Sequence, residues 1–186
     1  RRAVEATAGD ILTVVTASDE PRNCTVSYEG RVNHTEASAR IDLPTVDRGP
    51  WPTFVASELD VRIPLLGEHQ ALNAGIATML AGQVVGSLGD DEAADFDADT
   101  IGRGLRNAHW PGRFEVMREE PLIVLDGAHN PEATETLAET LSTFDYDELH
   151  LVFGAMHDKN ITEMAESLPT PDAVVTCRPN LDRAED

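Results

Sequence analysis

Two polar segments of the chain carry side chains whose types and spacing could do chemistry. The first is DGAHNP (126–131), directly after the apolar run LIVL (122–125). The Asp126 carboxylate could accept hydrogen bonds from hydroxyls or an amine, and the His129 imidazole could donate a hydrogen bond or stack on a ring. Composition alone slightly favours the alternative, a capped helix start in which both side chains bond only to neighbouring backbone.

The second segment is GAMHDK (154–159), which follows the run LHLVF (149–153). Its Lys159 is the only lysine in a chain whose other basic residues are all arginines. A flexible ammonium can contact a phosphate or carboxylate as a point charge in ways that a planar guanidinium does not. The alternative is a surface lysine without a role.

Motifs that would complete a catalytic site on their own are missing from the sequence. There is no GxxxxGK[ST] phosphate loop, no GxGxxG after a strand, no GxSxG nucleophile elbow and no HExxH metal motif. Cys24 and Cys177 lie far apart and form no CxxC pair, which indicates a reducing compartment and predicts no metal ligands. The chain therefore holds no complete catalytic apparatus.

The first half of the chain is expected to supply strands, followed by two helices. Four β-rich stretches so close together predict a largely antiparallel sheet, with a turn around Gly30. These stretches are Ile11–Thr16, Thr25–Tyr28, Thr35–Ile41 and Phe54–Ile63. Helices are predicted over 68–86 and around Asp97–Asn107. The apolar stripe of the first is Leu72, Ile76, Met79, Leu80 and Val84.

After the turn-forming HWPGR (109–113), strands and helices alternate. The expected strands are Phe114–Met117, Leu122–Leu125, Leu149–Phe153 and Ala173–Cys177, and the expected helices are Asn130–Phe144 and Asn160–Leu168. This alternation predicts an α/β fold with a parallel, doubly wound sheet. Ligands of such sheets gather at the carboxyl ends of the strands, where both polar segments lie.

Charge excludes several classes of partner. The 186 residues carry a formal net charge of −20, which repels nucleic acid and anionic membranes. Apolar runs are too short to span a bilayer and no signal peptide opens the sequence, so we expect a cytoplasmic protein. Acid excess with almost no lysine is typical of halophilic archaea, where salt screens the self-repulsion. The alternative is an ordinary acidic cytosolic protein. The first residue is Arg and not Met, so we expect a fragment.

Four stretches, read together, give the chain a resemblance to a known family. They are LLGEHQALNAGIATML (65–80), WPGRFEV (110–116), LIVLDGAHNPEATETLAETL (122–141) and VFGAMHDKNI (152–161). In this order they resemble the folylpolyglutamate synthase and dihydrofolate synthase branch of the Mur ligase superfamily. The resemblance covers roughly residues 60–184. It implies the C-terminal part of a central ATP-binding domain (1–109), a hinge (110–113) and the start of a Rossmann-like C-terminal ligase domain with a parallel sheet (114–186).

Such enzymes join an amino acid to a carboxylate with ATP and Mg²⁺. By resemblance, a folate or dihydropteroate carboxylate is phosphorylated to an acyl phosphate, and the amine of L-glutamate displaces the phosphate. The family's phosphate loop and metal ligands lie upstream of this chain, so the fragment alone is expected to be inactive.

The resemblance also assigns residues of this chain. Asn73 would read the adenine, Arg113 would reach the nucleotide from the hinge, and Asp126 and His129 would face its ribose and base. Lys159 and Asp158 would lie where glutamate meets the acyl phosphate and are the catalytic candidates. The nucleotide would then bridge the two domains.

Two alternatives stay open. One is another Mur-type amide ligase, such as a peptidoglycan-precursor enzyme, with the same chemistry and a different acceptor. The other is a nucleotide-binding module without catalysis.

Overall fold

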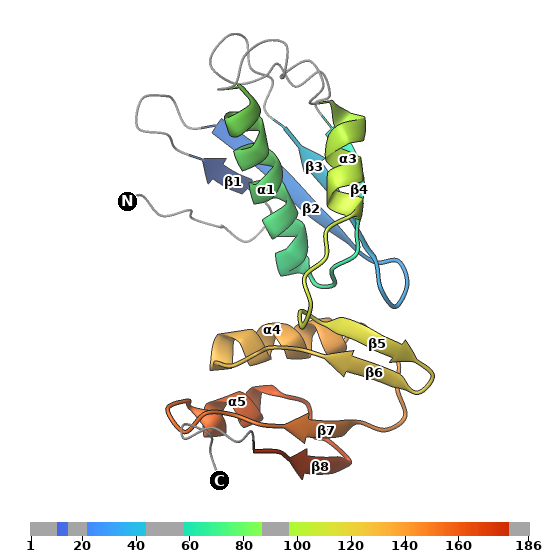
Figure 1. The fold of residues 1–186 in the computed structure, drawn as a ribbon, viewed down its shortest axis with the longest axis vertical. Coiled ribbons are helices and arrows are strands. Elements are labelled where there is room, and N and C mark those ends of the chain that lie inside the picture. The colour runs from blue at the N-terminus through green and yellow to red at the C-terminus, as the bar shows by residue number, and fades with distance from the viewer. Residues whose placement is uncertain (1–10, 15–21, 44–57, 87–96, 179–186) are drawn as a thin grey trace. The chain divides into compact units, whose positions relative to one another are not determined.

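The computed structural model describes residues 11–14, 22–43, 58–86 and 97–178. The chain divides into two compact units, Arg1–Pro111 and Gly112–Asp186 (Figure 1). The division falls inside the turn-forming segment that the sequence marks as a boundary. That residues 110–113 act as a hinge stays a prediction.

A four-stranded antiparallel sheet forms the base of the first unit. Its strands are β1 (Ile11–Val14), β2 (Arg22–Arg31), β3 (Ala37–Asp42) and β4 (Glu58–Ile63), and they neighbour one another in chain order. The expected antiparallel arrangement is therefore confirmed. Residues 15–16 and 54–57 of the predicted strands lie outside the described residues.

The turn between β2 and β3 lies later than the sequence indicated. Gly30, the expected turn residue, is still in β2, where its φ of 107° accompanies a register shift between Tyr28 and Gly30. Such a bulge takes a glycine because an L side chain is strained at this φ. The turn itself is built on Asn33, whose Oδ1 accepts the Thr35 N–H at 2.8 Å.

Alternation along β3 and β4 places one face of the sheet in the core. In β4, Leu59, Val61 and Ile63 are buried while the residues between them are exposed. On the other face, the Arg40 guanidinium of β3 lies between carboxylates of both neighbouring strands. Its Nε is 2.8 Å from Asp60 Oδ1 and its Nη2 is 3.9 Å from Glu29 Oε1.

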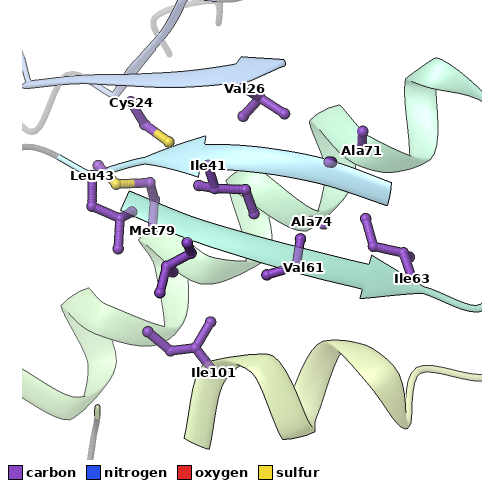
Figure 2. Close-up of a cluster of buried hydrophobic side chains, with 12 residues drawn as sticks. Cys24, Val26, Ile41, Leu43, Val61, Ile63, Ala71, Ala74, Met79 and Ile101 are labelled. Carbon is purple, nitrogen blue, oxygen red and sulfur yellow. The ribbon is translucent and has the colours of Figure 1, made fainter. Parts of the chain in front are cut away.

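Helices α1 (Glu68–Gly86) and α3 (Ala98–Arg106) pack on the sheet, α1 mainly against β2 and α3 against β4 (Figure 1). Figure 2 shows Met79 of α1 and Ile101 of α3 lying with the strand side chains in one cluster. Each fully buried apolar side chain of this kind contributes roughly 1.5–3 kcal/mol. Helix α3 begins as expected, because the Asp97 carboxylate accepts the Thr100 N–H at 2.8 Å.

The buried face of α1 differs from the predicted stripe. Ala71, Ala74 and Met79 are buried, whereas Leu80 and Val84 are 51% and 59% exposed. A helix that is apolar on most sides gives periodicity no basis for choosing a face. Met79 was predicted correctly, and Leu72 and Ile76 of the predicted stripe are partly buried against the core. None of the described helices is long and apolar enough to cross a membrane.

The second unit alternates short strands and helices, as predicted. Its elements are β5 (Glu115–Glu119), β6 (Leu122–Leu125), α4 (Pro131–Leu141), β7 (His150–Phe153), α5 (Ile161–Ser167) and β8 (Ala173–Thr176). β7 and β8 pair in parallel, which confirms the expected parallel sheet. β5 and β6 pair antiparallel, because the two residues between them allow only a hairpin and a parallel pair needs a long crossover.

Polar contacts join the helices of this unit. Thr134 of α4 is 1% exposed, and its Oγ1 lies 2.7 Å from Ser167 Oγ of α5. Asn130 caps α4 by accepting the Ala133 N–H at 2.8 Å, and Pro131 opens the helix, so the predicted helix start is confirmed. Met164 of α5 is buried, and α5 packs against α4.

Candidate functional site

Hydrogen bonds join the WPGR turn to the DGAHNP segment. The Asp126 Oδ2 accepts the Phe114 N–H at 2.7 Å, and its Oδ1 accepts the Ala128 N–H at 2.7 Å. The Gly127 N–H donates to the Gly112 carbonyl at 2.8 Å. A Cβ at Gly127 would lie 3.2 Å from that carbonyl oxygen, which is tighter than most Cβ contacts, so the two backbone segments approach closely here.

Phe114 has an unusual backbone conformation where the WPGR turn meets the DGAHNP segment, a place called the junction below. Its φ is 45°, in the left-handed region that costs a residue with a side chain roughly 1–2 kcal/mol. The Phe114 ring is 5% exposed and stacks on Phe144 with ring centroids 5.2 Å apart. The stacked ring and the Asp126 bond hold the conformation. Strain of this kind clusters at functional sites.

Arg113 and His129 present their side chains to solvent at the junction. Both are exposed, and within the described part of the chain the Arg113 guanidinium has no ion-pair or hydrogen-bond partner. The His129 Nδ1 lies 3.0 Å from the Gly127 carbonyl oxygen, which orients the ring. Both side chains are therefore able to contact an anionic or aromatic ligand.

The GAMHDK segment follows β7 in the same unit. Figure 1 draws β6, β7 and β8 pointing the same way, so the DGAHNP and GAMHDK segments both leave the carboxyl ends of their strands. Gly154 permits a close contact, because a Cβ there would lie 2.7 Å from the Cys177 carbonyl oxygen. Lys159 is partly exposed, and its ammonium has no partner among the described residues.

Asp158 is exposed beside Lys159 on the turn that precedes α5. This turn is closed by the Lys159 N–H, which donates to the Met156 carbonyl at 3.0 Å. The two predicted catalytic residues therefore lie on one tight turn.

Asn73 lies in the first unit, on the exposed side of α1. Its Nδ2 donates to Gln70 Oε1 at 3.2 Å, which restrains the orientation of the amide. An amide edge of this kind can pair with a base.

The described residues offer no group of three or more His, Cys, Asp or Glu side chains that could hold a metal ion. That the metal ligands lie outside this chain stays a prediction.

Sequence reasoning missed three residues that shape the junction. Gly112 has a φ of 70°, and its N–H donates to the Glu115 Oε2 at 2.8 Å. Phe114 is the third, since its backbone N–H is the partner of Asp126. The Pro-Gly pair indicates a turn at this place, but no pattern in the sequence tells which carboxylates bond to it.

Residues 112–186 match the family model described as Mur ligase, glutamate ligase domain. The chain is 53% identical over 180 residues to a Haloferax volcanii protein named probable bifunctional folylpolyglutamate synthase/dihydropteroate synthase, a match that covers 96% of this chain and 19% of that protein. It is 38% identical over 129 residues to the dihydrofolate synthase/folylpolyglutamate synthase of Bacillus subtilis, covering 69% of this chain and 29% of that protein. The chain thus spans about a fifth of the length of the Haloferax relative.

The fold resembles that of a solved structure, the Mycobacterium tuberculosis folylpolyglutamate synthase complexed with ADP. The TM-score is 0.65 at 28% sequence identity, and the match covers 87% of this chain and 33% of that chain.

Proposed function

We infer that this chain, which belongs to the folylpolyglutamate synthase and dihydrofolate synthase branch of the Mur ligase superfamily, is a portion of an ATP-dependent ligase that joins L-glutamate to a folate or dihydropteroate carboxylate. The resemblance drawn from the sequence motifs is confirmed by these matches, as is the expectation of a partial chain. The Haloferax relative fits the halophilic composition.

One observation carries the proposal: Asp126 joins the Arg113 turn to the segment that bears His129, so two side chains suited to a nucleotide emerge at one junction. The exposed guanidinium is able to approach phosphate oxygens, and the ring is able to stack on a base or donate to a ribose hydroxyl. The similar Mycobacterium tuberculosis enzyme was solved in complex with ADP, which supports a nucleotide as the ligand.

Electrostatics is the difficulty of the proposed reaction, since an anionic carboxylate must approach an anionic triphosphate. The carboxylate oxygen attacks the γ-phosphorus and ADP leaves; the glutamate amine then attacks the acyl carbon and phosphate leaves. We assign Lys159 to stabilising the negative charge that develops on the acyl phosphate, and Asp158 to orienting the incoming amine. Mg²⁺ belongs to the proposal, but the described residues supply no cluster to hold it.

The first test uses the full-length native protein in molar KCl. We expect folate- and glutamate-dependent release of phosphate from ATP, and no release with UDP-linked peptidoglycan precursors. Turnover of the UDP-linked substrates instead would favour the other Mur-type ligases. ATP binding without turnover of either would favour a non-catalytic nucleotide-binding module.

Substitutions in the same protein test the residues. Arg113→Ala and His129→Ala should each raise the KM for ATP, and Asn73→Ala should do the same. Arg118→Ala is the matched control, because this exposed arginine lies at the far end of the same hairpin, where its Nε donates to the Glu120 carbonyl. Unchanged ATP dependence in both Arg113→Ala and His129→Ala would contradict the assignment.

Lys159 is tested through turnover. Lys159→Met should lower kcat on the order of 10²-fold, the usual loss when one charge-stabilising donor is removed. Lys159→Arg keeps the charge and should retain more activity than Lys159→Met. Equal kcat values for Lys159→Met and the unsubstituted enzyme would remove Lys159 from the mechanism.

A further inference from the structure

We propose that Gln70 is a positioning residue that holds the Asn73 amide in the orientation suited to a 6-amino purine, and that it thereby sets a preference for adenine nucleotides over 6-oxo purine nucleotides. The inference deepens the proposed function and rests on it, because it takes Asn73 as the residue that reads the base. Both side chains belong to α1 in the first unit.

The first step is the contrast between the two side chains. Gln70 is 7% exposed, whereas Asn73, one helical turn later, is exposed. Residues three apart on a helix are neighbours, and here the Asn73 Nδ2 donates to the Gln70 Oε1 at 3.2 Å. An exposed amide is thus tied to a side chain that the fold encloses.

The second step is how firmly Gln70 is held. Its backbone N–H donates to the carbonyl of Gly67, the glycine with a φ of 105° that precedes α1, at 3.0 Å. Because the side chain is buried in a close-packed interior, its amide turns over only if its surroundings repack. Gln70 also belongs to the first turn of α1, where the partial positive charge of the helix end favours an oxygen over an N–H. The acceptor therefore stays in place.

The third step is the asymmetry of the Asn73 amide. It has one acceptor oxygen and one NH₂ group, whose two N–H bonds point in different directions. One N–H is given to Gln70, and within the described part of the chain the Oδ1 and the second N–H have no partner. An acceptor next to a donor is the pattern that matches the N6 amino group and a ring nitrogen of adenine.

A 6-oxo purine does not match this pattern. Hypoxanthine, the base of ITP, has an acceptor oxygen where adenine has its amino group. Asn73 can pair with that oxygen only by turning its NH₂ group toward it, which withdraws the N–H that Gln70 accepts. A buried acceptor left without its donor costs free energy. Gln70 therefore penalises the 6-oxo nucleotide and leaves the adenine nucleotide unaffected.

The test compares ATP with ITP in the full-length enzyme, through the KM of each nucleotide for folate- and glutamate-dependent release of phosphate. Gln70→Met keeps the size of the side chain and removes the acceptor. We expect the KM for ITP to fall about tenfold, which corresponds to about 1.4 kcal/mol, and the KM for ATP to change less than about twofold. A glutamine with only a structural role would raise both values together, because a loosened helix start favours neither nucleotide.

Gln70→Glu tests which partner donates. This variant keeps an acceptor at the same place and removes the NH₂ group, so we expect it to retain the preference for ATP. A fall of the preference in Gln70→Glu would overturn the inference, because the glutamine would then be the donor. Should Gln70→Met fail to fold, Gln70→Leu replaces it. An unchanged ratio of the two KM values in the folded variant would overturn the inference as well.

A double-mutant cycle tests whether Gln70 acts through Asn73. Asn73→Ala alone should lower the preference for ATP, and adding Gln70→Met should change the ratio of the KM values no further. A further change would overturn the inference, since Gln70 would then act on the base without Asn73. An unchanged preference in Asn73→Ala would also overturn it. Loss of ATP-dependent ligation in the unsubstituted enzyme is a different outcome, which removes the proposed function and the inference together.

Thr78→Val is the matched control. Thr78 is buried on the same helix, and its Oγ1 donates to the Ala74 carbonyl at 2.8 Å. The substitution removes one buried hydrogen bond of α1 without removing a partner of Asn73. We expect the ratio of the KM values for ATP and ITP to stay that of the unsubstituted enzyme. A change equal to that of Gln70→Met would mean that any weakening of α1 alters the preference, and would overturn the inference.

Discussion

Different interactions stabilise the interiors of the two units of the chain. In the first, apolar side chains from the sheet and two helices fill one continuous core. In the described part of the second, the buried apolar side chains are Phe114, Phe144 and Met164. Hydrogen bonds also join its elements, including the partly buried contact between Thr134 and Ser167.

This difference decides how each unit responds to change. Apolar burial is non-directional, so a core tolerates movement but loses stability when atoms are removed. Hydrogen bonds and close backbone contacts fix angles and distances. The candidate residues Arg113, Asp126, His129 and Lys159 all lie in the second unit, where geometry depends on a few such contacts.

The largest expected effect is the truncation of the first core. Ile41 is 0% exposed at the centre of the sheet (Figure 2), so Ile41→Ala should cost about 3 kcal/mol. Hydrogen exchange in the full-length protein should show the loss at the amides of β2, β3 and β4. Ile41→Val, as the graded control, should cost about 1 kcal/mol. Faster exchange in β7 and β8 in place of β2, β3 and β4 would contradict the view that this core stabilises the first unit.

The next effect tests the close contact between Gly154 and the backbone of Cys177 in the second unit. A Cβ at Gly154 would lie 2.7 Å from the Cys177 carbonyl oxygen and 2.8 Å from its Sγ. Gly154→Ala should therefore separate the ends of β7 and β8 and cost about 2 kcal/mol.

Gly104→Ala is the control, because nothing lies within 4 Å of a Cβ added there and helix α3 gains propensity. We expect Gly104→Ala to leave the first unit as stable as before or slightly more stable. Hydrogen exchange, measured separately for the amides of each unit, checks both variants. Equal behaviour of the two alanine variants would contradict the close contact.

A smaller effect concerns the start of α4. Asn130→Ala removes the acceptor of the Ala133 N–H and should cost about 1 kcal/mol. The amides of the first turn of α4 should exchange faster, while those of α3 in the other unit stay unchanged. Thr136→Ala, on the exposed side of the same helix, is the control. A loss of the same size in Thr136→Ala would show that the cap is not the cause.

The smallest effect at neutral pH is that of Cys24. Burial, with a lesser contribution from Asp42, raises the pKa of its thiol from 9.0 to about 11. The unfolded thiol ionises first, so the folded state loses stability only as the pH rises from about 9 to about 11. Denaturant midpoints measured from pH 8 to 11 should show this loss in Cys177→Ala and a smaller one in Cys24→Ala. Identical profiles would contradict burial as the cause.

Much of the fold follows from local patterns. Alternation in β4 and the cap residues Asp97 and Asn130 mark their elements because each depends on neighbours within a few positions. The buried face of α1 could not be predicted, since the choice between Leu80 and Ala74 depends on which side the sheet lies. The turn after β2 was misplaced because Gly30 serves a bulge and Asn33 makes the turn.

The positions of Asp126 and Lys159 after the carboxyl ends of β6 and β7 could be predicted, because each follows a run of strand-forming residues. The backbone partner of Asp126 could not be predicted, because every residue except proline has a backbone N–H. Phenylalanine is also not a residue type that indicates a positive φ. The roles of Asn73, Arg113, His129, Asp158 and Lys159 stay predictions.

Arg40 shows what the near absence of lysine means for the sheet. One planar guanidinium reaches Asp60 on one side and Glu29 on the other, so a single side chain links three consecutive strands. A lysine ammonium is a compact point charge and lacks this fork. In brine, where the Debye length falls to about 3 Å at 1 M, only charges in direct contact still attract each other. The 2.8 Å contact between Arg40 and Asp60 is of this kind and would persist at high salt, whereas the 3.9 Å contact with Glu29 would weaken.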